Sequence, residues 1–378
     1  MNVYICYENR HSLKINQNRK FKIALVGDCL ANGGAEKVHA MLSIYFQKQG
    51  FEVYNCIFVD WISYAYSGSL LNLGNINANA SFLKRKKARY FEFQKFIKEN
   101  NFDAILDFRM RTSFLQELII SKCCYPKNTF YTVHSGILDF YFPKTAWLSV
   151  LIYKNKKIAA VSKAIQAAII SKGLAKQVFQ IYNPVDIKGS TVLKQEYRVS
   201  EGNYILALGR MNEEVKQFEQ LIRAYSKSVL PQKQIKLILL GDGKNILKYE
   251  ALANQLGLKE LVLFKGFVNN PFPYYQNALF TVLSSKNEGF PNVILESLAV
   301  ATPVVSFDCF SGPNEIIVDK QNGLLVANQS FEKLTEAFNL MLEDTQLYEF
   351  CKQNARSSCT PYDIEIIGKQ WIELLKIK

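Results

Sequence analysis

The chain has 378 residues, which is too many for one ordinary hydrophobic core and fits two domains of roughly 150–200 residues each. Hydrophobic residues make up 49% and charged residues 21%, which excludes a disordered chain and indicates a globular protein. The formal net charge of +13 favours an anionic partner, such as nucleic acid, a membrane surface or a phosphorylated substrate.

The cysteines and histidines do not form a metal-binding pattern. Eight cysteines and three histidines are scattered along the chain, and no Cys-x-x-Cys pair occurs. No apolar run reaches the roughly 18 residues of a membrane-spanning helix, and the N-terminal segment lacks the apolar core and cleavage site of a signal peptide. The sequence therefore predicts a cytoplasmic protein with reduced thiols and no bound metal.

The first half begins with a strand–helix–strand pattern. "FKIALVGD" (residues 21–28) and "FEVYNCIFVD" (residues 51–60) are apolar runs typical of strands, and residues 31–50 between them have a helical apolar period. Residues 3–7 form either an extra strand or part of a polar lead-in. A further strand is expected at residues 129–133.

The pattern starts again after residue 200. The helix "KQFEQLIRAYSKSV" (residues 216–229) presents one apolar face. Five apolar runs predict strands at residues 203–209, 235–243, 261–267, 278–285 and 302–308.

Strands that are apolar throughout and alternate with helices predict parallel sheets covered on both faces. The fold class is therefore α/β, with two doubly wound Rossmann-like domains facing each other across a cleft. Residues 1–190 form the first domain in this interpretation, and residues 191–361 form the second. Residues 362–378 form a helix that crosses back to the first domain.

Two glutamates flank a helix start in "SSKNEGFPNVILESL" (residues 284–298). Ligands of open parallel sheets bind outside the carboxyl ends of the strands, and free backbone N–H groups at a helix start attract anions. Glu288 and Glu296 would bind hydroxyl groups on either side of such an anion. The alternative is two solvated carboxylates with no shared role. The turn between them consists of Gly289, Phe290, Pro291, Asn292 and Val293.

"EGFPNVILE" resembles the E-x7-E signature of the GT-B-fold retaining glycosyltransferases of family 4, the glycosyl transferases group 1. The resemblance implies that Glu288 contacts the donor sugar and that Glu296 holds the nucleotide ribose. It also implies transfer of a sugar from a nucleotide diphosphate sugar to an acceptor hydroxyl, with retention of anomeric configuration. In this family the first domain binds the acceptor and the second binds the nucleotide sugar, which the resemblance implies for residues 1–190 and 191–361.

"LGRMNEEVKQF" supplies two cations near the predicted anion site. Gly209 ends a strand, Arg210 follows it, and Lys216 comes six residues later. Arg210 and Lys216 would neutralise a departing diphosphate, which is why no metal cofactor is expected. The alternative is a solvated pair of basic residues. Gln217 departs from the small residue that the family has after this lysine.

Two further glycine turns match the resemblance. Gly241 and Gly243 follow one strand, and Phe267 and Val268 follow the next. In relatives the base is held by the backbone after this Gly-Phe, which makes Val268 the expected base-binding position. Gly-x-Gly alone is weak support.

"SGPNE" resembles the branch of the family that builds bacterial surface polysaccharides and lipid-linked oligosaccharides. This resemblance implies a UDP-hexose or UDP-N-acetylhexosamine donor and a glycan or lipid-linked acceptor. Gly312 would let the backbone approach the donor.

The first half supplies the remaining candidates. Gly33 and Gly34 lie at a strand-to-helix turn, where the family's loop closes over the donor diphosphate; the alternative is a packing turn. Glu36 either contacts acceptor hydroxyls or caps the helix. His134 follows a strand and matches a family histidine near the donor sugar, although lone histidines are often structural. Ser162 and its neighbour Lys163 are expected to border the cleft, and residues 183–186 lead into the linker.

Residues 82–101 combine a basic cluster with aromatic residues. The pattern predicts either docking on an anionic membrane, at the inner face of the plasma membrane, or a solvated helix whose aromatic side chains pack inward. The basic residues are Lys84, Arg85, Lys86, Lys87 and Arg89, and the aromatic ones are Tyr90, Phe91, Phe93 and Phe96.

Two rival functions remain. A nucleotide-sugar epimerase or hydrolase of the same fold would bind the same donor and would need acid/base carboxylates in the cleft. No clear carboxylate base is expected in the first half, where an inverting transferase would need one, which agrees with retention. A nucleic-acid-binding protein is suggested by charge alone, without a recognition motif, so no nucleic-acid partner is expected. A Rossmann dehydrogenase is excluded because neither first turn reads G-x-G-x-x-G.

Overall fold

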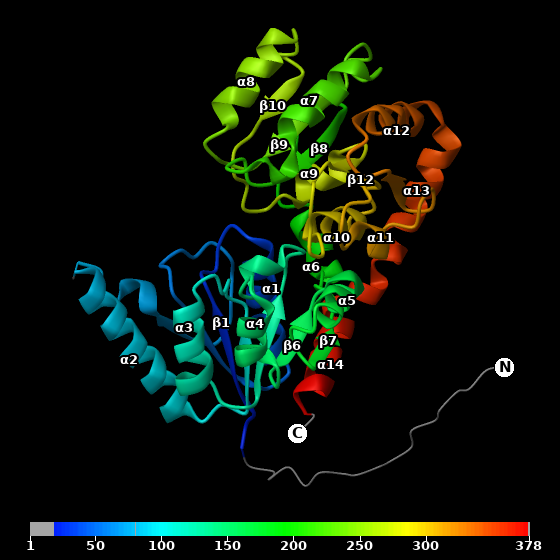
Figure 1. Ribbon diagram of the computed structural model, residues 1–378. Helices are drawn as coiled ribbons and strands as arrows, with labels where there is room; N and C mark the ends of the chain where they lie inside the picture. The colour runs from blue at the N-terminus through cyan, green and yellow to red at the C-terminus, as the bar shows by residue number, and fades with distance from the viewer. Residues whose placement is uncertain (1–18, 80, 377–378) are drawn as a thin grey trace, which may run out of the picture.

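The computed structural model describes residues 19–79 and 81–376, so the strand expected at residues 3–7 lies outside the described residues. Two parallel sheets, each flanked by helices, stack one above the other (Figure 1). This arrangement is the two-domain α/β architecture predicted from the sequence.

The first sheet has seven strands in the order β3-β2-β1-β4-β5-β6-β7, all parallel. Its strands are uniformly buried at the centre, which explains the unbroken apolar runs in the sequence. The strands are β1 Lys22–Gly27, β2 Glu52–Ile57, β3 Ser69–Asn72, β4 Ala104–Asp107, β5 Thr129–Val133, β6 Lys157–Ala160 and β7 Gln177–Gln180.

Helices cover both faces of this sheet. One face packs against α2, α4 and α5, and the other against α1 and the C-terminal helix α14. The helices are α1 Gly34–Lys48, α2 Phe82–Asn100, α3 Phe114–Ile119, α4 Ala146–Tyr153, α5 Lys163–Ser171 and α14 Ile364–Leu375.

The second sheet has six parallel strands in the order β10-β9-β8-β11-β12-β13. Its strands are β8 Tyr204–Leu208, β9 Lys236–Leu240, β10 Val262–Phe264, β11 Thr281–Leu283, β12 Val304–Phe307 and β13 Gly323–Val326. The helices of this half are α6 Ile187–Leu193, α7 Phe218–Lys227, α8 Ile246–Gln255, α9 Phe272–Asn277, α10 Asn292–Ala299, α11 Pro313–Ile316, α12 Phe331–Glu343 and α13 Thr345–Ser358.

Both sheets reverse their strand order at an equivalent place. The first sheet reverses between β1 and β4, and the second between β8 and β11. Open parallel sheets bind ligands at this switch point, outside the carboxyl ends of the strands. The loops after β1 and β8 therefore mark where a shared ligand would lie.

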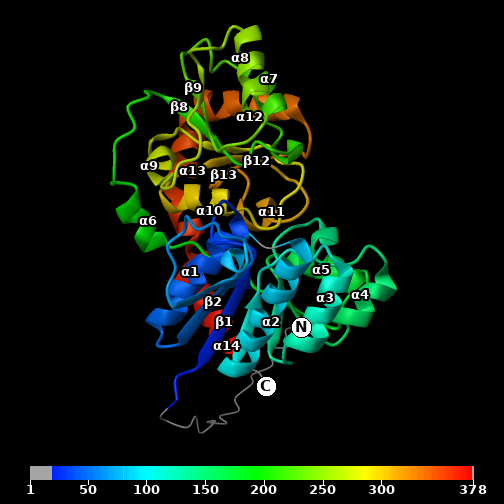
Figure 2. The same ribbon diagram turned by 90° about the vertical axis from the view of Figure 1, so that its left-hand side faces the viewer.

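The chain passes between the two halves twice. The predicted boundary between residues 190 and 191 falls within α6, whose N-terminus is capped by Asp186. At the other end, α13 and α14 lead from the upper half back down to the first sheet (Figures 1 and 2). Ile367 and Trp371 of α14 lie buried beside α1, where Gly368 packs so closely on Tyr45 that a Cβ at this glycine would lie 2.2 Å from the Tyr45 ring.

Candidate functional site

A pocket of about 370 Å³ lies between the two halves, at their switch points. Its walls come from the loops after β1, β5, β8, β9 and β11 and from the first turns of α1 and α10. Most of the residues predicted for the site line this pocket: Gly33, Gly34, Glu36, His134, Gly209, Arg210, Lys216, Gly241, Val268, Glu288, Gly289, Phe290, Pro291, Asn292, Val293 and Glu296.

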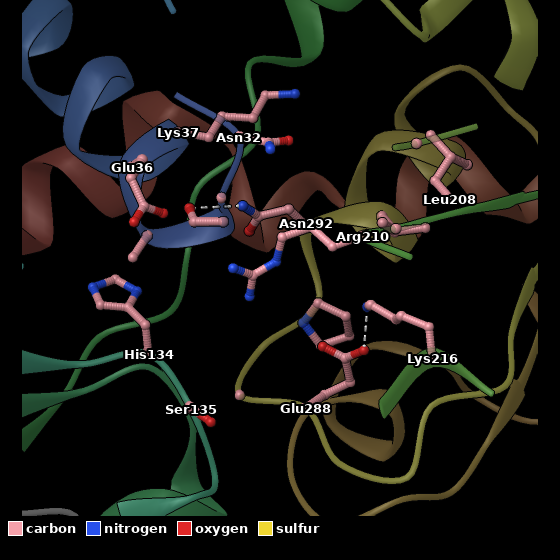
Figure 3. A pocket seen from close by; sticks show the side chains of 18 of the residues that line it. Asn32, Glu36, Lys37, His134, Ser135, Leu208, Arg210, Lys216, Glu288 and Asn292 are labelled. Atoms are coloured by element: carbon pink, nitrogen blue, oxygen red, sulfur yellow. Dashed lines mark hydrogen bonds and ion pairs between the residues drawn. The ribbon is translucent and has the colours of Figure 1, made fainter. Parts of the chain in front are cut away.

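Glu288 is paired with Lys216 inside the pocket. The Lys216 Nζ lies 2.6 Å from Glu288 Oε1, and both side chains are mostly buried (Figure 3). The backbone carbonyl of Glu288 accepts a hydrogen bond from the Gly136 N–H of the first half, at 3.0 Å. The loop that carries Glu288 is thus bonded to the loop that carries His134.

The Arg210 residue is more exposed to solvent than Lys216. Its guanidinium points into the pocket between Asn292 and Glu288 (Figure 3). The preceding Gly209 has φ +156°, and a Cβ there would lie 2.9 Å from the stem of Lys216. The tight turn after β8 therefore places both cations on one side of the pocket, where they can bind a diphosphate.

Glu296 is held by residues from both halves. The carboxylate is 7% exposed, and its Oε1 lies 2.5 Å from the Lys37 Nζ of α1. Its Oε2 accepts a hydrogen bond from the buried Tyr275 hydroxyl at 3.0 Å, and burial, then Glu296, raises the pKa of Tyr275. Sequence reasoning did not identify Lys37 or Tyr275.

The first turn of α10 opens into the pocket without a side-chain cap. Pro291 precedes the first helical residue, Asn292. The Asn292 amide donates to the Gly34 carbonyl at 3.1 Å and accepts from Asn183 at 3.0 Å (Figure 3). Asn183 also donates to the Phe290 carbonyl, which makes it a support of the turn between the two glutamates.

His134 is partly buried and lies against the ring of Phe108, with 5.4 Å between the ring centroids. Burial, followed by the positive charge of Arg111, lowers its pKa to about 3. His134 is therefore neutral near pH 7. Its ring nitrogens are buried and have no partner of good hydrogen-bond geometry among the described residues.

Glu36 brings a carboxylate to the first-domain side of the pocket. Its side chain folds back over Gly33, where a Cβ would lie 1.9 Å from the Glu36 Oε2. Burial raises the pKa of this carboxyl group. Glu36 thus places a carboxylate of the first half in the pocket wall.

Glycines bring the nucleotide-side loops together. A Cβ at Gly241 would lie 2.0 Å from the Gly209 carbonyl oxygen, so the loops after β8 and β9 touch through backbone. Val268 lies in the pocket wall beside these loops. Gly243 and Phe267 line a second, neighbouring cavity of about 440 Å³ together with Trp61.

Ser162 and Lys163 do not line the pocket. The Ser162 hydroxyl lies 2.5 Å from that of Ser311, behind the pocket. The Glu315 carboxylate accepts from the N–H groups of Lys163 and Ala164 at the first turn of α5. The expectation that Ser162 and Lys163 border the cleft was wrong, because both join the two halves at a separate contact.

Gly312 also lies outside the pocket wall, and its backbone has a φ of +100°. A Cβ there would lie 2.5 Å from Pro291 Cδ and 3.1 Å from the Gly289 carbonyl oxygen. This glycine lets the α11 loop pack behind the turn between the paired glutamates, rather than against a ligand.

The basic segment forms α2, and its aromatic residues divide between two environments. Phe93 is buried, and Tyr90 and Phe96 pack against the same core. Phe91 is exposed. Arg89 is not part of the exposed basic surface, because its guanidinium donates to the Gly74 carbonyl at 2.6 Å.

Exposed apolar side chains continue from α2 over α3 and α4, which lie side by side in Figures 1 and 2. The exposed apolar residues of these helices are Phe82, Leu83, Phe91, Leu115, Ile119, Trp147 and Leu151. Within residues 19–79 and 81–376, no helix combines the length and apolar character that crossing a membrane requires. The same residues contain no group of three or more histidine, cysteine or acidic side chains arranged to hold a metal ion.

Comparisons with known proteins agree with this architecture. Residues 191–358 match the family model of glycosyl transferases group 1. A Campylobacter jejuni N-acetylgalactosamine-N,N'-diacetylbacillosaminyl-diphospho-undecaprenol 4-alpha-N-acetylgalactosaminyltransferase is 29% identical, over 92% of this chain and 97% of that protein. The Erwinia amylovora amylovoran biosynthesis glycosyltransferase AmsD is 25% identical, over 94% of this chain and 99% of that protein.

A solved structure of Anabaena HepE in complex with UDP and glucose has a TM-score of 0.74 and 21% identity, over 94% of this chain and 99% of that one. This structure supports the fold across both halves, whereas the family model covers the second half. Residues 191–358 are thus similar to the glycosyl transferases group 1, and the chain is a glycosyltransferase with the GT-B fold.

Proposed function

We propose that the chain transfers a hexose or N-acetylhexosamine from a UDP-sugar to a glycan or lipid-linked acceptor, with retention of anomeric configuration. One observation carries the proposal: the pocket joins Glu288 and Glu296, the cations Arg210 and Lys216, and an uncapped helix start at the switch points of both sheets. This combination fits a ligand that has hydroxyl groups on either side of a diphosphate.

The donor would lie along this row of groups. Glu296 would accept hydrogen bonds from the ribose hydroxyls, and Glu288 from the sugar. Arg210, Lys216 and the first turn of α10 would bind the diphosphate between them. Gly241 and Val268 would border the base. The complex of HepE with UDP and glucose supports a uridine nucleotide in a fold of this kind.

The reaction would break the bond between the sugar C1 and the β-phosphate oxygen, and the electron pair would stay on that oxygen. Arg210 and Lys216 would stabilise the charge that develops on the diphosphate. The acceptor oxygen would bond to C1 from the face that the phosphate leaves. Its proton would pass to the leaving phosphate oxygen, so that no metal ion or protein base is required.

His134 and Glu36 would act on the sugar side. A buried neutral imidazole can exchange hydrogen bonds with a sugar hydroxyl without bringing a charge. Glu36 would contact the acceptor. If the product is inverted, Glu36 is the candidate general base, because a carboxylate whose pKa is raised can accept the acceptor's proton.

The acceptor class follows from the names of the relatives. One is a transferase named for a diphospho-undecaprenol substrate, another for amylovoran biosynthesis, and a Salmonella typhimurium relative is a lipopolysaccharide 1,6-galactosyltransferase, 25% identical over 87% of this chain. We therefore propose a role in the synthesis of cell-surface polysaccharide.

A lipid-linked acceptor would be reached from a membrane surface. The outer face of α2 combines the exposed Leu83 and Phe91 with the exposed Lys84, Lys86 and Lys87. Basic side chains near an anionic surface contribute about 1 kcal/mol each. We propose peripheral binding of this face to the inner side of the plasma membrane.

The membrane proposal is tested by sedimentation with vesicles that contain phosphatidylglycerol. Replacing Lys84, Lys86 and Lys87 by glutamine should weaken binding on the order of 100-fold, from about 1 kcal/mol for each lysine. Unchanged binding would contradict this surface. A control replaces three exposed lysines elsewhere on the same half: Lys48, Lys172 and Lys176.

The transferase proposal is tested by turnover of UDP-, GDP- and ADP-sugars, with and without a short polyprenyl-diphosphate glycan acceptor. UDP release that depends on acceptor, with an α-linked product from an α-linked donor, supports it. An inverted product contradicts retention. Donor turnover that yields an epimer or a free sugar, equally fast without acceptor, supports the epimerase or hydrolase alternative.

A further inference from the structure

We propose that Lys37 is a donor-positioning residue that the first half supplies to the second. Its ammonium fixes and neutralises the Glu296 carboxylate, so that the nucleotide site is complete only when the two halves are in contact. The inference rests on the proposed function, in which Glu296 binds the ribose.

The contact is short and well supported. Lys37 lies in the first turns of α1, and its Nζ is 2.5 Å from Glu296 Oε1. The Tyr275 hydroxyl holds the other carboxylate oxygen at 3.0 Å, and the ring of Phe272 lies 5.4 Å from the ammonium. Each carboxylate oxygen keeps a second acceptor site, so two ribose hydroxyls can bind without displacing Lys37.

The positive charge of Lys37 also neutralises Glu296 close to the proposed diphosphate site. Glu296 is almost fully buried and lies in the same pocket as the proposed diphosphate site. An unpaired buried carboxylate is strongly unfavourable and would repel a diphosphate. Lys37 removes this repulsion and leaves the oxygens free to accept hydrogen bonds.

The cation comes from the other half of the molecule. Lys37 and Gly34 belong to the first turns of α1, whereas Glu296 and Asn292 belong to α10. The Asn292 amide donates to the Gly34 carbonyl (Figure 3). If the halves separate, Glu296 loses its cation and Asn292 loses its partner together. Donor binding and contact between the halves are therefore coupled.

The test measures binding of uridine and of UDP to the full chain by calorimetry. Lys37→Met should weaken uridine binding by on the order of tenfold, the effect of losing a charge-assisted hydrogen bond that orders the ribose site. UDP binding should weaken by at least as much, because the unpaired Glu296 carboxylate also repels the diphosphate. Lys37→Arg should keep binding within about threefold of the unaltered chain because it keeps the charge and donors. Lys48→Met, at the exposed end of the same helix, is the matched control and should bind as the unaltered chain does.

A double substitution tests whether Lys37 acts through Glu296 or contacts the ligand directly. Adding Lys37→Met to Glu296→Gln should change the uridine Kd by less than about twofold, because the neutral amide needs no cation. A tenfold loss in that background would contradict the proposal. So would a loss confined to UDP, which indicates a direct phosphate contact.

Thermal unfolding without ligand identifies a purely structural ion pair. Such a pair would lower the unfolding temperature of Lys37→Met while leaving both Kd values unchanged, and this result would overturn the inference. Failure of the unaltered chain to bind UDP or uridine would instead overturn the proposed function, and the inference with it.

Discussion

Gly289 offers a steric test of the contact between the two halves. Its backbone lies outside the left-handed region, so alanine is conformationally acceptable there. A Cβ at this position would nevertheless lie 2.0 Å from the His134 carbonyl oxygen and 2.6 Å from its carbonyl carbon. Ordinary van der Waals contact begins at about 3.4 Å, so the two loops must separate by roughly 1 Å.

That separation would move Glu288 and its hydrogen bond to Gly136 away from the His134 side of the pocket. A misplacement of about 1 Å costs on the order of 100-fold in rate. We therefore expect Gly289→Ala to lower kcat/KM for sugar transfer by about that factor, with an unchanged circular dichroism spectrum. The control is Gly257→Ala, which has a strained φ of +71° but no atom within 4 Å. A near-normal rate for Gly289→Ala would refute this account of the contact.

Three further predictions concern charge and protonation. Arg210→Met should lower kcat at saturating donor by about 10- to 100-fold, as expected for losing one donor to a developing anion; an effect on donor KM alone would contradict a role in the transition state. Sugar transfer should be unchanged in excess EDTA, because the proposed reaction uses cationic side chains, and a loss that Mg²⁺ or Mn²⁺ restores would contradict the metal-free mechanism. Burial lowers the pKa of His39 to about 4, so the unfolded chain takes up the proton first and stability falls as the pH drops below about 6.5. Between pH 7.5 and 5, the free energy of unfolding should fall by about 2 kcal/mol less in His39→Gln than in the unaltered chain, measured by urea unfolding at both pH values. An identical pH dependence in the two proteins would contradict a buried neutral imidazole.

Much of the fold could be predicted from local patterns in the sequence. Apolar runs marked the central strands because both faces of each parallel sheet are covered, and the apolar face of residues 216–229 marked α7. The paired glutamates were found because Gly289 and Pro291 mark a turn and a helix start. A strand end and a helix start in adjacent sequence are enough to locate one wall of the pocket.

The opposite wall depends on contacts between distant parts of the chain. Lys37 follows Glu36 on a helix, and nothing local distinguishes it from other lysines in a chain with 46 basic residues. Its importance arises only because α1 meets α10 across the pocket. Tyr275 was missed for the same reason, since its hydroxyl is significant only beside Glu296.

Residue type alone gave wrong predictions where a polar group forms a hydrogen bond within the protein. Arg89 looked like part of a basic surface, but it satisfies the Gly74 carbonyl. Lys163 looked like a cleft residue, but its N–H is capped by Glu315 from the other half. A sequence shows which groups can bind, whereas tertiary contacts decide whether they bind substrate or chain.

A crystal structure of the chain with bound UDP would test the central claim most directly. The account predicts ribose hydroxyls within hydrogen-bond distance of Glu296, with Lys37 still on the same carboxylate. It also predicts the diphosphate between Arg210, Lys216 and the first turn of α10. UDP bound away from Glu296, or with its diphosphate facing neither cation, would contradict the assignment of this pocket to the donor.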